Sequence, residues 1–163
     1  MSTHPTPQRH TLVGAPERRA ADVTLVVGWN GQPDSIAAVH VAADLARRLH
    51  GHLHLVHIVD ADDLPIDPDA DDWGRQLTAT LDEQARRARA ELDDLDNGWT
   101  YHAWHGDPAD LLGRVADEVD AYFVVLGNPR AGVVSRLEAL TGGSVSHRMI
   151  HDRHRPVLLV PAN

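Results

Sequence analysis

A glycine-containing segment is the strongest candidate for chemistry in this sequence. It follows the apolar run YFVVL, begins at Gly127 and continues through Gly132 and Gly142 to Gly143. Ser144 comes next, at the expected start of a helix. Glycine lets the backbone approach a ligand closely, and free amides at a helix start favour a phosphate group. The pattern suggests phosphate binding, although the same glycines are also typical of tight turns.

A second candidate loop, Trp29-Asn30-Gly31, follows the first apolar strand, residues 23–28. In an open parallel sheet, ligands bind at the carboxyl ends of strands, where the winding direction reverses. Both this loop and the one that begins at Gly127 lie at such ends. Both loops are therefore candidates for ligand binding.

Two missing residue types exclude several chemistries. The chain has no cysteine, which rules out disulfides, thiolate nucleophiles and Cys-zinc sites. All fifteen cationic side chains are arginine, so a Walker-A lysine or a Schiff-base lysine is impossible. Ser144 and Ser146 lie near His147, but GGSVS is not the Gly-x-Ser-x-Gly nucleophile elbow. We expect no catalytic site.

Twelve histidines raise the question of a metal site. His52 and His54 share one face of a predicted strand, and His147 and His151 are spaced i, i+4 on a predicted helix. Such pairs ligate zinc only with a third ligand, and none is evident, so we expect no metal. His57 lies on the same strand as the first pair, and we treat it as a group that could titrate near neutral pH.

Composition indicates a single globular domain with an N-terminal arm. The chain has 163 residues and a net charge of −9, which argues against nucleic acid and anionic membranes as partners. Residues 1–21 lack hydrophobic periodicity and contain no apolar h-region, so we expect a flexible arm and no signal peptide. The domain then covers 22–163, and the expected location is cytoplasmic.

The rest of the sequence alternates strand-like and helix-like patterns. Continuous apolar or β-branched runs predict five buried strands, at residues 23–28, 53–59, 99–104, 122–126 and 156–160. Apolar residues at helical spacing predict the four intervening helices, at residues 34–49, 77–95, 108–119 and 144–151. Asp107 and Pro108 suit the N-cap and first turn of the third helix. This order implies a parallel sheet with helices on both faces.

Four stretches make the pattern specific: VTLVVGWNG, LHLVHIVD, HGDPADLLGRVADEVDAYFVVLGN and GGSVSHRMIHDRHRPVLLVP. Together they span residues 23–161 and resemble the single-domain members of the universal stress protein family. The resemblance implies an α/β fold with an open, doubly wound, five-stranded parallel sheet in the order 3-2-1-4-5. This is the Rossmann-like arrangement of the adenine-nucleotide alpha-hydrolase-like folds.

The family's nucleotide-binding branch carries Gly-x2-Gly-x9-Gly-Ser/Thr in the last loop, which wraps the ATP phosphates. Carried over to this sequence, Gly127 is the first glycine, preceded by Leu126, and Gly143-Ser144 is the final pair. The resemblance also places adenine beside the backbone of Ile58. Asn30 stands where the family has an aspartate near the nucleoside.

This sequence departs from the pattern in the last loop. Arg130 replaces the second glycine, and Gly132 is separated from Gly143 by ten residues instead of nine. Arginine cannot take over a glycine's positive φ, but its guanidinium can bind phosphate. Asn30 keeps an acceptor oxygen, gains a donor and loses the charge of an aspartate. We count all of these residues as binding candidates.

The resemblance predicts ATP or a related adenine nucleotide with Mg²⁺, bound as a signalling or regulatory ligand. Any ATP hydrolysis would be slow and incidental. The apolar final strand predicts an exposed sheet edge, and the family resemblance implies a homodimer formed through it. The alternative is a dimeric interaction module of the same family that binds no nucleotide.

Overall fold

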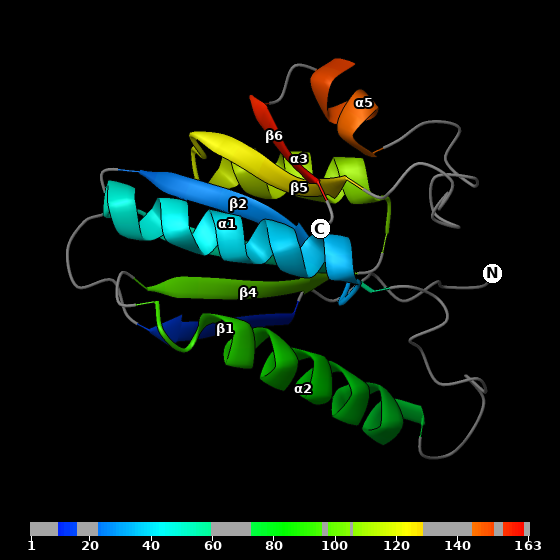
Figure 1. The fold of residues 1–163 in the computed structure, drawn as a ribbon. Coiled ribbons are helices and arrows are strands. Elements are labelled where there is room, and N and C mark those ends of the chain that lie inside the picture. The colour runs from blue at the N-terminus through cyan, green and yellow to red at the C-terminus, as the bar shows by residue number, and fades with distance from the viewer. Residues whose placement is uncertain are drawn as a thin grey trace.

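The computed structural model describes residues 10–15, 23–59, 73–95, 98–104, 106–128, 145–151 and 155–161. Within these ranges, strands and helices alternate from β2 onward (Figure 1). The elements are β1 (His10–Ala15), β2 (Thr24–Trp29), α1 (Pro33–Leu49), β3 (His52–Ile58), α2 (Trp73–Leu92), β4 (Trp99–Trp104), α3 (Pro108–Glu118), β5 (Phe123–Asn128), α5 (Val145–His151) and β6 (Val157–Pro161).

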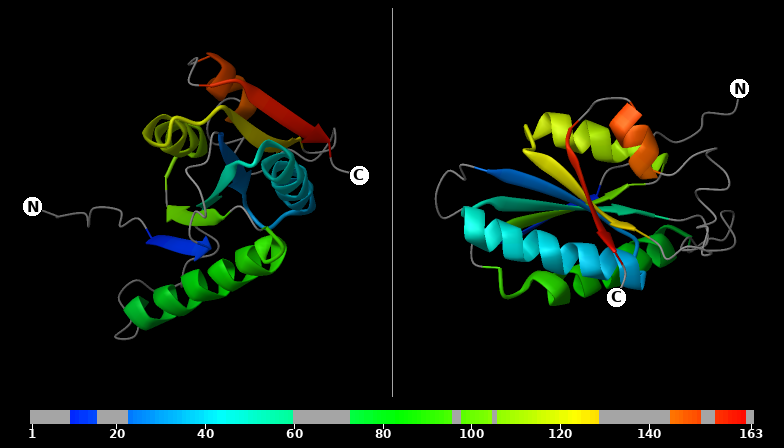
Figure 2. Two further views of the ribbon diagram at one scale, coloured as in Figure 1. Left: turned by 90° about the vertical axis from the view of Figure 1, so that its left-hand side faces the viewer. Right: turned by 45° about the horizontal axis from the view of Figure 1, so that its top comes forward.

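The six strands form one sheet in the order β1-β4-β3-β2-β5-β6. The five strands from β2 to β6 are parallel, and their order confirms the predicted 3-2-1-4-5 arrangement. Helices α1 and α2 cover one face, and α3 and α5 cover the other (Figure 2). The winding direction reverses at β2, which has β3 on one side and β5 on the other.

β1 corrects one sequence prediction. Residues 10–15 were expected to belong to an unstructured arm, but they form a strand that pairs antiparallel with β4. The segment HTLVGA is too short to show a clear alternation, and only its distant partner, residues 99–103, makes it a strand. β1 covers the β4 edge of the parallel sheet, which would otherwise present unpaired backbone groups. The rest of the predicted arm lies outside the described residues.

Small side chains bring α1 close to the sheet. Its buried stripe consists mostly of alanine, and the spacing of these residues matches one face of a helix. β2 supplies continuous apolar residues to both faces, as expected for a strand covered on both sides. α3 begins as predicted, since the Asp107 carboxylate accepts a hydrogen bond from the Asp110 amide. No helix in the described ranges is long and apolar enough to cross a membrane.

Candidate functional site

The carboxyl ends of β2, β3 and β5 lie next to one another in the sheet. They bring together four of the candidate residues: Asn30, Ile58, Leu126 and Gly127. The other four candidates, Arg130, Gly132, Gly143 and Ser144, lie outside the described residues. The described half of the site is therefore formed by three strand ends and the first turn of α1.

Asn30 shapes the turn between β2 and α1. Its side-chain oxygen accepts a hydrogen bond from the Gln32 backbone N–H at 3.0 Å, and its backbone N–H donates to the Ser35 hydroxyl at 3.3 Å. Gly31 follows with a φ of 75°, a left-handed conformation that favours glycine. The turn thus uses the oxygen of Asn30 internally. The NH₂ group of this exposed side chain is the part suited to a ligand.

Gly127 is required by packing. A Cβ atom at this position would lie 2.5 Å from the Asp34 carbonyl carbon and 2.9 Å from the Ser35 nitrogen, both in the first turn of α1. β5 therefore approaches the start of α1 with backbone against backbone. The sequence predicted that glycine lets the backbone approach a ligand here; the described contact is a packing contact with α1. Leu126, just before it, is buried against α3 and α5.

The backbone of Ile58 faces the same turn. The next amide, that of Val59, donates to the Trp104 carbonyl of β4 at 2.8 Å. Successive residues of a strand direct their amide and carbonyl to opposite sides, so those of Ile58 face β2. The last paired residue of β2 is Trp29, which lies opposite His57. The Ile58 backbone is thus placed beside the turn that Asn30 forms.

Sequence reasoning missed a buried aromatic cluster beneath this edge. Trp29 meets the ring of His57 edge-on at 5.0 Å, and His57 Nδ1 hydrogen-bonds the Tyr101 hydroxyl at 2.7 Å. Burial lowers the pKa of His57 to about 4, so the expectation that it titrates near neutral pH is wrong. In the sequence, the signal for this cluster was the tryptophan directly before Asn30. The cluster provides a neutral, aromatic wall.

Three other histidines gather on the opposite face of the sheet. His54 Nδ1 and His102 Nε2 are 2.8 Å apart, and the two rings stack. His52 Nε2 is hydrogen-bonded to the Thr100 hydroxyl at 2.9 Å. Across the described ranges, no three histidine, aspartate or glutamate side chains are arranged to hold a metal ion. The side chains of the second predicted pair, His147 and His151, are not among those described.

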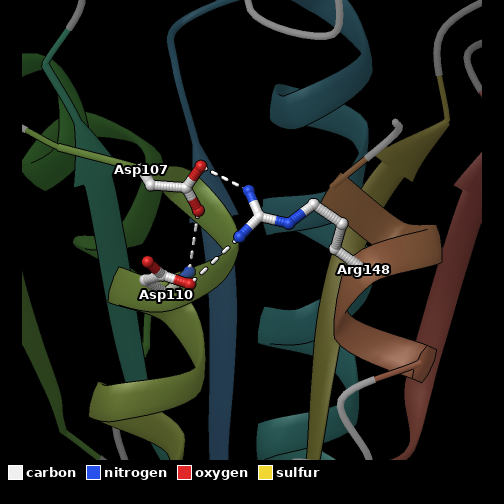
Figure 3. A network of polar contacts seen from close by, with 3 residues as sticks. All are labelled: Asp107, Asp110 and Arg148. Carbon is white, nitrogen blue, oxygen red and sulfur yellow. Dashed lines mark hydrogen bonds and ion pairs between the residues drawn. The ribbon is translucent and has the colours of Figure 1, made fainter. Parts of the chain in front are cut away.

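An ion-pair network ties α5 to the start of α3 (Figure 3). One guanidinium nitrogen of Arg148 contacts the Asp107 carboxylate, and the other lies 3.1 Å from Asp110 Oδ1. Partial burial raises the pKa of Asp107, but hydrogen bonds from the Asp110 amide and Arg148 outweigh it and hold that pKa below its usual value. α5 begins directly after Ser144, so this network fixes the helix that follows the candidate glycine segment.

A shallow apolar groove of about 570 Å³ lies on the α1 face, at the β6 edge of the sheet. Leu158 and Leu159 of β6 are also partly exposed, at 38% and 40%. β6 is the last strand of the sheet on this side, as predicted. The groove is lined by Pro33, Ile36, Ala37, His40, Val41, Val160 and Pro161.

The sequence matches known relatives over most of its length. A universal stress protein of Methanocaldococcus jannaschii is 24% identical over 140 residues, which is 83% of this chain and 80% of the relative. One from Mycobacterium bovis is 28% identical over 144 residues, 85% of this chain and 48% of the relative. The chain thus spans about half the length of this mycobacterial protein.

Solved structures share the fold. A universal stress protein crystallised in complex with cAMP has a TM-score of 0.60 and 26% identity, covering 88% of this chain and 100% of that one. An Archaeoglobus fulgidus universal stress protein in complex with dAMP has a TM-score of 0.58 and 20% identity, covering 85% and 98%. The Universal stress protein family model matches residues 24–161. The chain therefore belongs to the universal stress protein family.

Proposed function

We propose that this protein binds an adenine nucleotide, ATP or a relative of it with Mg²⁺, at the carboxyl ends of β2, β3 and β5, and acts as a regulatory module. The observation that carries the proposal is the convergence of three candidate residues at the point where the sheet reverses direction. Asn30, the Ile58 backbone and Gly127 come from three different strand ends. Such a point is where open α/β sheets bind ligands.

The described residues suit a nucleoside better than a catalytic centre. The Ile58 carbonyl can accept a hydrogen bond from the edge of a base, and the Asn30 NH₂ group can donate to ribose oxygens. Trp29 and His57 offer a neutral aromatic boundary beside them. We assign the phosphates to Gly143 and Ser144, with Gly132 in the turn and Arg130 as a guanidinium partner. Family structures solved with cAMP and dAMP support the choice of adenine.

Calorimetric titration with ATP·Mg²⁺ and with AMP tests this function. Wild-type protein should bind, and Gly143→Asp should abolish binding, because a carboxylate would face the phosphates. Ala90→Asp, which adds the same charge to the exposed side of α2, is the matched control and should bind normally. The proposal is wrong if millimolar nucleotide produces neither heat nor a thermal shift in the wild type.

The second candidate is an interaction module that binds no nucleotide. The groove between α1 and β6 and the exposed Leu158 and Leu159 favour it, because apolar surface at an open sheet edge invites a partner. We propose a cytoplasmic homodimer formed through β6, which is compatible with either candidate. A dimer together with no nucleotide binding would favour the second candidate.

A further inference from the structure

Trp29 carries a polar atom that the fold leaves unsatisfied. Its side chain is 3% exposed, and its indole nitrogen Nε1 is buried with no hydrogen-bond partner among the described residues. Buried donors are nearly always paired, because burial removes the water that would otherwise accept from them. An unpaired N–H therefore weakens the fold unless something else accepts from it.

The N–H edge of the ring faces the candidate site. A Cβ atom placed on Gly31 would meet Trp29 Cζ2 at 3.8 Å. Cζ2 and Nε1 are bonded to the same ring carbon, Cε2, so they lie on the same edge of the indole. That edge points toward the turn between β2 and α1, where Asn30 forms its hydrogen bonds. The unsatisfied donor thus lies on the side of the ring that is next to this turn, at the carboxyl edge of the sheet.

The rest of the cluster holds the ring and does not compete for the donor. His57 meets the indole edge-on, and its Nδ1 is already engaged with the Tyr101 hydroxyl. Tyr101 also contacts the indole edge-on, with 6.5 Å between ring centroids. A ring fixed by two neighbours is a preorganised donor.

We infer that the Trp29 indole N–H donates a hydrogen bond to a ring nitrogen of the bound adenine. This rests on the proposed function and adds a residue that selects the base. Adenine offers unprotonated ring nitrogens in the plane of a flat, neutral, aromatic group. The wall that Trp29, His57 and Tyr101 form is likewise aromatic and neutral, which suits a base better than a phosphate.

Removing only this donor tests the inference. Trp29→Phe keeps an aromatic ring, and replacement of Trp29 by 3-benzothienylalanine keeps the bicyclic shape while sulfur takes the place of N–H. AMP binding measured by calorimetry should weaken about fivefold to tenfold in both variants, the loss expected for one hydrogen bond. Trp99→Phe is the control: Trp99 is 2% exposed but lies at the opposite ends of the strands, and its affinity should stay within about twofold.

Analogues of AMP identify the acceptor. The analogues are 1-deaza-, 3-deaza- and 7-deaza-AMP. For one of the three, the benzothienyl variant should bind as tightly as the wild type, since that analogue has already lost the accepting nitrogen. The inference is overturned if the benzothienyl substitution weakens the binding of all three analogues equally. It is also overturned if both variants bind AMP as tightly as the wild type does. If wild-type protein binds no adenine nucleotide, the proposed function and this inference fail together. If it binds and the variants bind equally well, only this inference fails.

Thermal denaturation without nucleotide separates binding from folding. The benzothienyl variant removes an unsatisfied donor, so it should melt no lower than the wild type. A variant that loses affinity while keeping this stability supports a ligand contact. A lower melting temperature together with unchanged affinity would mean that Trp29 contributes only to the core.

Discussion

Replacing Arg148 with methionine should loosen the connection between α5 and α3. The substitution keeps most of the aliphatic side chain and removes both ion-pair contacts. Arg148 and Asp107 are 30% and 25% exposed, and a charge-assisted pair in that setting contributes about 1 kcal/mol. Asp110 is 61% exposed, so its contact adds only about 0.3 kcal/mol. We expect a loss of about 1–1.5 kcal/mol, or roughly 2–6 °C in melting temperature for a chain of this size.

A double-mutant cycle with Asp107→Asn isolates the main contact. Asparagine keeps an oxygen to cap α3, and it replaces the charged Oδ2 that Arg148 contacts with an uncharged NH₂ group. Urea denaturation at pH 7 of the wild type, both single variants and the double variant should give a coupling energy of about 1 kcal/mol. A coupling below about 0.3 kcal/mol, within the usual additivity error, would refute the reasoning.

The same carboxylate gives this prediction a pH dependence. Since the pKa of Asp107 is held below its usual value, its contribution is fully present above about pH 4. It is lost as the pH falls through the lower, folded-state pKa. The stability difference between wild type and Asp107→Asn should therefore be constant at neutral pH and shrink in strong acid. A difference that grows on acidification would contradict the assignment.

Three further predictions follow from the core and the edges of the sheet. In the wild type, the free energy of unfolding should fall by about 1.4 kcal/mol per pH unit on acidification from pH 6.5 to about 4, because the buried His57, whose pKa is lowered, resists the proton that the unfolded chain accepts. His57→Gln should remove this pH dependence, and urea titrations across that range measure it. Gly127→Ala should destabilise by more than about 2 kcal/mol in chemical denaturation, since the new methyl group would meet the Asp34 backbone. Leu159→Arg should make the proposed dimer monomeric in sedimentation velocity without unfolding it, and an unchanged sedimentation coefficient would contradict the β6 interface.

Most of the fold could be predicted because its patterns are local. Apolar or β-branched runs identified all five parallel strands, and apolar residues at helical spacing identified α1, although its buried face proved to be mostly alanine. Asp107 and Pro108 identified the start of α3 to the residue. β1 could not be found in this way, because a six-residue strand of mixed polarity is defined by pairing with β4, more than eighty residues away.

The positions of the described candidate residues in the fold could be predicted, but their contacts could not. The sequence placed Asn30, Ile58 and Gly127 at neighbouring strand ends, and the sheet order confirms that they are neighbours. It did not show that Gly127 packs against α1, or that burial holds His57 neutral. Each of these depends on groups distant in sequence. The contact between Arg148 and Asp107, 41 residues apart, is invisible for the same reason.

Two departures from local rules lie at the carboxyl edge of the sheet. α3 starts with a capping carboxylate, whereas the N-cap residue of α1, Gln32, makes no side-chain capping hydrogen bond. The same edge holds the unsatisfied indole N–H of Trp29. The positive φ of His50 at the other edge needs no such explanation, because it is an ordinary left-handed C-cap of α1. Natural chains tend to break local rules at functional sites, which supports the site proposed at the ends of β2, β3 and β5.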